Sequence, residues 1–122
     1  MASILIIEDD QRLRLALKEN LTYRGYEVTD ACNGLEGINM FITNRPDLIV
    51  MDIIMPEKEG IETIRELKRD YPSVKIIAIS GGGTLGPEHY LKVATAMGAD
   101  RALKKPFRTD ILVGSIEELL TL

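Results

Sequence analysis

Short apolar runs that alternate with amphipathic segments constrain the fold of this 122-residue chain more than any other feature of its sequence. The runs are rich in Ile, Leu and Val, and apolar residues spaced three or four apart follow each of them. Runs that are apolar throughout indicate strands buried on both faces. The predicted strands are residues 3–7, 26–30, 47–51, 74–79 and 100–103.

The segments between these runs have the spacing of helices. The first helix is predicted to begin at Asp10, whose carboxylate caps its first turn, and to close at Gly25. The others are predicted at 33–42, at a segment before Pro72, at 87–97 and at 109–122. In the second helix, Leu35, Ile38, Phe41 and Ile42 are predicted to face inward. Strands that alternate with single helices predict an α/β, doubly wound parallel sheet with right-handed crossovers.

Bulk properties fit one globular domain over residues 1–122. The net charge of −4 argues against direct nucleic-acid binding, which needs a basic face. The sequence has a single cysteine, Cys32, no basic leader with a cleavage site, and no apolar run long enough to cross a bilayer. We therefore expect a soluble cytoplasmic protein without a membrane partner.

Chemically reactive residues follow the predicted strands at their carboxyl ends. Glu8 and Asp9 follow the first strand, Asp52 the third, Ser80 the fourth, and Lys105 comes shortly after the fifth. Because the carboxyl ends of parallel strands share one edge of a sheet, these side chains are expected to converge. Three neighbouring carboxylates need a cation, and oxygen-only ligands suit Mg²⁺. The sequence predicts a magnesium site at this edge.

Asp52 is the predicted nucleophile, because a strand-end aspartate can form an acyl phosphate. Lys105 is expected to neutralise charge on a transferring phosphoryl group, and the Ser80 hydroxyl to donate to one of its oxygens. A cis peptide bond between Lys105 and Pro106 is a further prediction, because proline makes the cis form accessible.

These residues resemble the receiver domains of bacterial response regulators, and the resemblance covers the whole chain. In order along the chain, the motifs that carry it are ILIIEDD at 4–10, DLIVMD at 47–52 with Met55-Pro56 and Gly60 after it, IS at 79–80, MGA at 97–99 and KPF at 105–107. The resemblance implies a flavodoxin-like, CheY-like fold of five parallel strands, in the order 2-1-3-4-5, with five helices.

The resemblance also implies residue roles. Asp52 looks like the phosphoacceptor, and Asp9 and Asp52 look like direct Mg²⁺ ligands. Glu8 would act on the metal through water, and Ile54 would offer its backbone carbonyl. Ser80 and Lys105 look like the switch hydroxyl and the phosphate-sensing lysine.

A signalling role with protein partners follows from the same resemblance. A histidine kinase or histidine phosphotransfer protein would donate the phosphoryl group, and an unknown downstream protein would respond. The chain would assist its own phosphorylation and dephosphorylation without being an enzyme for another substrate. The face formed by the fourth helix, fifth strand and fifth helix is the expected contact surface, with a homodimer as one possibility. If the chain is complete, it lacks an output domain and acts through protein contacts.

The sequence departs from the family at two positions. Ala102 stands where many receivers have an aromatic residue, and Ile54 stands where the family often has a polar side chain. Ile54 also counts against the alternative of a phosphatase of the haloacid dehalogenase type, which needs a general acid there.

Another alternative is a flavin or nucleotide module, since residues 81–86 match G-x-G-x-x-G, but this turn follows the fourth strand rather than the first.

Overall fold

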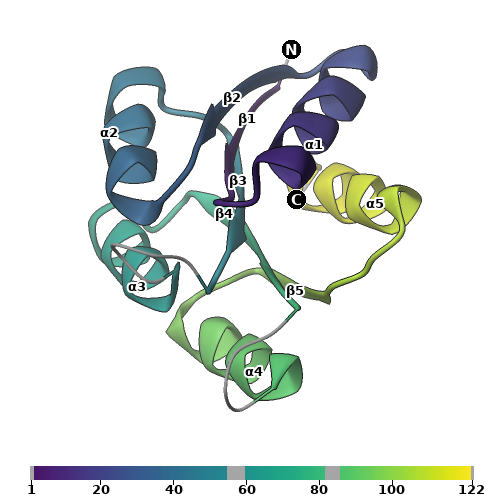
Figure 1. Ribbon diagram of the computed structural model, residues 1–122. Helices are drawn as coiled ribbons and strands as arrows, with labels where there is room; N and C mark the ends of the chain where they lie inside the picture. The colour runs from purple at the N-terminus through teal and green to yellow at the C-terminus, as the bar shows by residue number, and fades with distance from the viewer. Residues whose placement is uncertain (1, 55–59, 82–85, 122) are drawn as a thin grey trace.

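The computed structural model describes residues 2–54, 60–81 and 86–121, without the side chains of Pro87 and Tyr90. Strands and helices alternate along the chain (Figure 1). The elements are β1 (Ser3–Ile7), α1 (Gln11–Tyr23), β2 (Glu27–Ala31), α2 (Gly34–Asn44), β3 (Leu48–Asp52), α3 (Gly60–Asp70), β4 (Lys75–Ser80), α4 (Pro87–Met97), β5 (Arg101–Lys104) and α5 (Thr109–Leu120).

The strands form one parallel sheet in the order β2-β1-β3-β4-β5. This confirms the predicted fold class and strand order. The chain runs from β1 outward to β2, then returns across β1 to β3, so the strand order reverses beside β1 and β3. Ligand sites in such sheets lie at the carboxyl ends of the strands near this reversal.

Helices cover both faces of the sheet, and each face has its own apolar core. Alternate residues of β1 illustrate the division: Ile4 and Ile6 pack with α1 and α5, whereas Leu5 and Ile7 pack on the face of α2, α3 and α4. All four side chains are fully buried. Figure 1 shows α1 and α5 together on one side and α2 and α3 on the other. The central strands are therefore apolar on both faces, which explains their continuous runs of Ile, Leu and Val.

Four of the predicted strands begin and end one residue earlier than the observed ones, because strand ends carry polar residues that do not follow the apolar pattern. Asp52 is the last residue of β3 and Ser80 is the last residue of β4. Both residues are therefore held by the sheet itself. Met55-Pro56 and residues 82–85 of the glycine-rich segment lie outside the described residues.

The prediction that Leu35 and Ile42 of α2 face the core is wrong. Their side chains are 60% and 50% exposed, whereas Gly34, Gly37 and Phe41 are buried. A Cβ at Gly37 would lie 2.9 Å from Ile7 Cγ1, so the missing side chain lets the helix approach β1 along its glycine face. This approach turns Leu35 and Ile42 outward.

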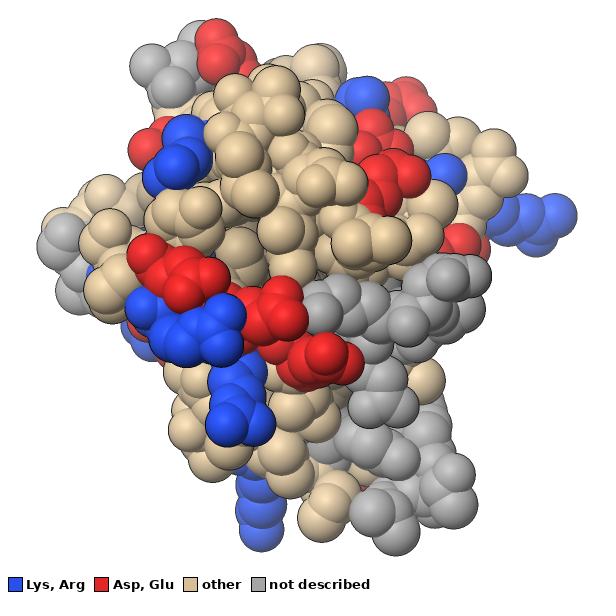
Figure 2. Space-filling view, turned by 90° about the vertical axis from the view of Figure 1, so that its left-hand side faces the viewer, with Lys and Arg blue, Asp and Glu red and all other residues tan. Residues whose placement is uncertain are grey.

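The outer surface of α2 is consequently poor in charge. Glu36 is the only charged residue within α2, whereas α3 carries charged side chains along most of its exposed length. Figure 2 shows this side of the molecule, with an uncharged area over α2 and a cluster of acidic and basic side chains below it.

The amino terminus of α1 is capped as predicted. The Asp10 side chain accepts hydrogen bonds from the backbone N–H groups of Arg12 and Leu13, and Gly25 follows the helix with a φ of 100°. This cap fixes the turn that carries Glu8 and Asp9 from β1 into α1. Within the described ranges, no helix is long and apolar enough to cross a membrane.

Candidate functional site

The fold brings the predicted site residues to one edge of the sheet. Glu8 and Asp9 form the turn after β1, Asp52 and Ser80 end their strands, and Lys105 directly follows β5. Glu8 and Ser80 are fully buried and Asp52 is 5% exposed, whereas Asp9 faces solvent. Several charged or polar side chains are thus removed from water at one position, which is costly unless they interact with one another or with a ligand.

Three carboxylates form the acidic part of this site. One oxygen each of Glu8, Asp9 and Asp52 can be chosen so that all three lie within 4.8 Å of one another. Glu8 and Asp52 come from neighbouring strands, because β1 pairs with β3. A set of carboxylate oxygens, partly buried and open to solvent at Asp9, suits a hard divalent cation that keeps some of its water. The donor set therefore fits Mg²⁺.

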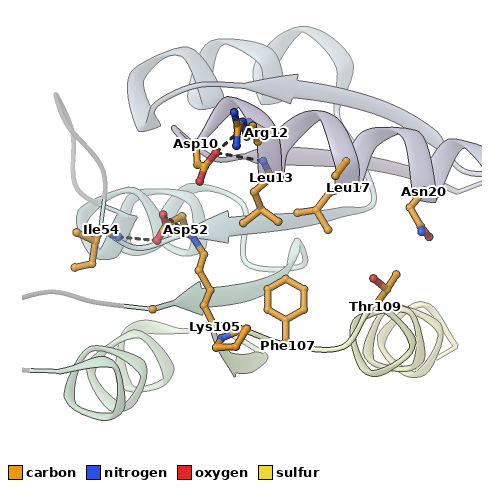
Figure 3. Close-up of a pocket in the computed structure, with 13 residues that line it drawn as sticks. Asp10, Arg12, Leu13, Leu17, Asn20, Asp52, Ile54, Lys105, Phe107 and Thr109 are labelled. Carbon is orange, nitrogen blue, oxygen red and sulfur yellow. Dashed lines mark hydrogen bonds and ion pairs between the residues drawn. The ribbon is translucent and has the colours of Figure 1, made fainter.

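Lys105 places its ammonium group between two of these carboxylates. Its Nζ lies 2.8 Å from Glu8 Oε1 and 3.2 Å from Asp52 Oδ2. Only the Asp52 contact also has hydrogen-bond geometry; the Glu8 contact is an ion pair in which Oε1 makes no hydrogen bond to the described residues. The Lys105-Pro106 bond is cis, which confirms the prediction. Figure 3 shows the lysine side chain extended toward Asp52.

Burial and proximity shift the pKa of two of these groups. The pKa of Glu8 is raised to about 7, chiefly by burial; Lys105 partly lowers it and the charge of Asp52 raises it. Burial alone would lower the pKa of Lys105, but Glu8 and Asp52 outweigh it and raise that pKa above its ordinary value. The lysine is therefore a fixed positive charge, and the carboxylates have capacity for a second cation.

Ser80 and Ile54 flank Asp52. In the β3–β4 register Asp52 lies opposite Ile79, so Ser80 is one residue further along the neighbouring strand. Its Oγ is buried and has no hydrogen-bond partner among the described residues. A buried hydroxyl without a partner is costly, so a ligand that enters the site could accept a hydrogen bond from it. The backbone N–H of Ile54 donates to Asp52 Oδ1 at 3.1 Å and so orients the carboxylate.

Sequence reasoning missed one part of the site, the support for Glu8. Arg14 Nη1 donates to the Glu8 carbonyl oxygen at 2.9 Å, and Arg14 Nε donates to Asp30 Oδ2 at 3.0 Å. Lys18 Nζ binds the other oxygen of Asp30 at 2.9 Å. The available signal was the pair of cations Arg14 and Lys18, spaced four apart on the predicted helix, with an acid ending the second strand.

A groove opens beside the site between α1 and the segment from β5 to α5. Its volume is about 850 Å³, and its walls include Leu13, Leu17 and Phe107, with Asp52 and Lys105 at one end. Figure 3 shows these apolar side chains beside the charged pair. The reactive end of the site is thus accessible from outside, although Asp52 itself is almost buried.

Known proteins resemble this chain in sequence and in fold. A family model described as Response regulator receiver domain matches residues 4–117. A protein named Response regulator MprA from Mycobacterium sp. (strain KMS) is 31% identical over 117 residues, which cover 96% of this chain and 50% of that protein. The same name and identity recur in Mycobacterium avium (strain 104). The chain therefore spans about half the length of these curated relatives.

Solved structures resemble the whole chain. A response regulator receiver domain protein from Clostridium thermocellum superposes with a TM-score of 0.90 at 29% identity, covering 99% of this chain and 95% of that one. The response regulator TrrA from Thermotoga maritima, solved in complex with Mg(2+)-BeF, has a TM-score of 0.86 at 32% identity, covering 98% and 99%. Sequence and structure agree, and the chain belongs to the response regulator receiver domain family.

Proposed function

We propose that this chain accepts a phosphoryl group on Asp52 from the phosphohistidine of a histidine kinase or histidine phosphotransfer protein, in a Mg²⁺-dependent reaction. Membership of the receiver family supports a role in two-component signalling. The observation that carries the proposal is the position of Lys105 Nζ, within 3.2 Å of Asp52 and 2.8 Å of Glu8. The lysine supplies one positive charge next to an aspartate that lies at the end of an accessible groove.

Asp52 is suited to act as the nucleophile. The Ile54 N–H holds Oδ1 and Lys105 holds Oδ2, so the carboxylate has a defined orientation before a donor arrives. In the transfer, a carboxylate oxygen bonds to phosphorus while the phosphorus–nitrogen bond to the donor imidazole breaks, which leaves an acyl phosphate on Asp52 and a free histidine on the donor. Because the Asp52 carboxylate is oriented in advance, less entropy is lost on reaching the transition state of phosphoryl transfer.

Glu8, Asp9 and Asp52 are the side chains that we propose to hold Mg²⁺, with the backbone carbonyl of Ile54 as a further ligand. Asp9 and Asp52 would bind directly and Glu8 through water. Their approach within 4.8 Å supports this assignment, as does the Mg(2+)-BeF complex of the Thermotoga relative. When bound, Mg²⁺ supplies positive charge to the phosphoryl oxygens.

Ser80 and Lys105 would then contact the phosphorylated aspartate. The Ser80 hydroxyl, which is buried without a partner among the described residues, is available to donate to a phosphoryl oxygen. Lys105 would exchange its contact with Asp52 for one with the phosphoryl group. Ser80 ends β4 and Lys105 follows β5. The two residues are linked directly, because the Lys105 backbone N–H donates to the Ser80 carbonyl oxygen at 2.9 Å. Movement at one is therefore transmitted to the other.

The surface of α4, β5 and α5 is the proposed output of this change. Met97 of α4 and Ile111 of α5 are 38% and 51% exposed, which supports a protein contact there, including a homodimer. Ala102 of β5 is partly buried and has no aromatic ring to rotate. We therefore propose that the switch operates through the Ser80 and Lys105 backbone rather than through a swinging aromatic side chain, with residues 1–122 acting as one receiver domain.

The decisive experiment is intact-protein mass spectrometry after incubation with acetyl phosphate, with Mg²⁺ or with EDTA. Wild type and Asp52→Asn are compared with Asp47→Asn, a matched control because Asp47 stands just before β3 while Asp52 ends it. The proposal expects one phosphoryl group that requires Mg²⁺, is present in Asp47→Asn and is absent in Asp52→Asn. Equal labelling of all three proteins, or no labelling at all, would overturn it.

A further inference from the structure

Glu8 is held through both its backbone and its side chain. Its N–H donates to the Ala31 carbonyl at 3.0 Å, its Oε2 accepts from the Asp10 N–H at 3.2 Å, and Lys105 lies beside Oε1. Because Glu8 lies beyond the last residue of β1, its carbonyl is outside the strand ladder. Arg14 donates to this carbonyl at 2.9 Å.

Arg14 is itself fixed by a second contact. Its Nε binds Asp30 Oδ2 at 3.0 Å, and its side chain is only 15% exposed. A guanidinium presents donors in a rigid planar fork, so the two contacts made by Nε and Nη1 determine each other's direction. Asp30 lies opposite Ile6 in the β1–β2 register. The arginine therefore ties the turn after β1 to the end of β2.

We infer that Arg14 is a positioning residue for the acidic cluster, which acts through the Glu8 carbonyl to set the directions of the Glu8 and Asp9 side chains and so the affinity for a divalent cation. The inference rests on the proposed Mg²⁺ site. The Arg14 guanidinium donates to the Glu8 carbonyl and to Asp30. Its contribution to Mg²⁺ affinity is therefore geometric. Groups that orient metal ligands commonly change metal affinity by about tenfold or more when they are removed.

Lys18 provides a matched comparison. It also binds Asp30, at 2.9 Å, and also carries one positive charge, but within the described part of the chain it makes no contact with Glu8. Arg14→Met and Lys18→Met therefore remove the same charge and one ion pair to the same aspartate. Only Arg14→Met also leaves the Glu8 carbonyl without its donor. A difference between the two variants reports the contact with Glu8.

The test is calorimetric titration of Mg²⁺ into the unphosphorylated proteins, alongside urea unfolding in EDTA as a measure of structural loss. Arg14→Met is expected to raise the Mg²⁺ dissociation constant about tenfold. Lys18→Met should leave it within about twofold of wild type, as for a partly exposed ion pair. Phosphorylation at saturating Mg²⁺ should change little in Lys18→Met, because within the described residues Lys18 pairs with Asp30 and not with Glu8.

Arg14→Lys is a second variant, which keeps the inference testable if Arg14→Met does not fold. A single ammonium can serve the carbonyl or Asp30 but not both in the same fixed geometry, so an intermediate loss of Mg²⁺ affinity is expected. Wild-type affinity in both Arg14 variants, or an equal loss in Lys18→Met, would overturn the inference while leaving the phosphoacceptor proposal intact. Failure of wild type itself to bind Mg²⁺ would overturn both.

Discussion

Lys105 Nζ lies 3.2 Å from Asp52 Oδ2, although the two residues are 53 positions apart in the sequence. Asp52 ends β3 and Lys105 follows β5, with β4 between the two strands. The Lys105 side chain therefore passes the carboxyl end of β4 to contact both Asp52 and Glu8. Much of the electrostatic behaviour of the site follows from this one cation among three carboxylates.

Replacing the lysine should destabilise the protein when no divalent cation is present. Lys105→Met leaves Glu8 and Asp52 buried beside each other without a counter-charge, and we expect the free energy of unfolding in EDTA to fall by about 2 kcal/mol. Lys104→Met is the control, because Lys104 pairs with Glu88 on the surface. Urea denaturation at pH 7 measures both. An equal loss in the two variants would mean that the buried pair contributes nothing specific.

Mg²⁺ should stabilise the folded protein in a saturable way. A ligand at about ten times its dissociation constant adds about 1.4 kcal/mol to the free energy of unfolding if it binds only the folded state. Glu8→Gln should weaken this response because it removes a carboxylate of the cluster. Glu19→Gln, a change on the exposed side of α1, should retain the full response. Thermal unfolding at increasing Mg²⁺ concentrations provides the measurement, and identical curves for both variants would exclude Glu8 from the site.

Stability at acid pH should depend on Asp30. Burial would raise the pKa of Asp30, but Lys18 and Arg14 together lower it below the ordinary value of 3.8. A carboxylate whose pKa is lower in the folded state contributes stability above the unfolded value and loses it as pH falls through the folded one. Asp30→Asn removes this contribution.

The measurement is chemical denaturation of wild type and Asp30→Asn at several pH values from neutral to about 3. The stability advantage of wild type should be full at neutral pH and shrink as the pH falls below 3.8. In the Lys18→Met background, the stability lost on Asp30→Asn should be smaller and should depend less on pH than in wild type, because Lys18 is one of the two cations that lower the Asp30 pKa. A difference between wild type and Asp30→Asn that is constant with pH would show that the ion pairs do not favour the charged carboxylate.

Two glycines should respond oppositely to alanine. A Cβ at Gly60 would meet the backbone of the β3 end, at 2.6 Å from the Asp52 carbonyl oxygen and closer still to Ile53 Cα. Gly60→Ala should therefore cost about 1–3 kcal/mol and displace Asp52. Gly114→Ala in α5 has nothing within 4 Å of the new Cβ and should be neutral or stabilise by up to about 1 kcal/mol. Urea denaturation and phosphorylation rates report the two effects, and an unaffected Gly60→Ala protein would contradict the close packing.

The strands, their parallel arrangement and the convergence of acidic residues were predictable without coordinates. Buried parallel strands need continuous apolar runs, and each run here ends in a turn or in the polar residue that the site uses, as at Asp52 and Ser80. The carboxyl ends of parallel strands must share an edge, so residues at those ends meet whatever the details of packing. The positions of Glu8, Asp9, Asp52, Ser80 and Lys105 at one edge follow from that rule alone.

Contacts that depend on how closely and at what angle a helix packs were decided only in three dimensions. Leu35 and Ile42 follow the helical period but point outward, because Gly37 allows α2 to approach Ile7 and so rotates its buried face. The bond from Arg14 to the Glu8 carbonyl depends likewise on where α1 lies above β1 and β2. Periodicity specifies which residues share a face of an element, whereas the distance and rotation between elements come from the side chains of both partners, which no single segment contains.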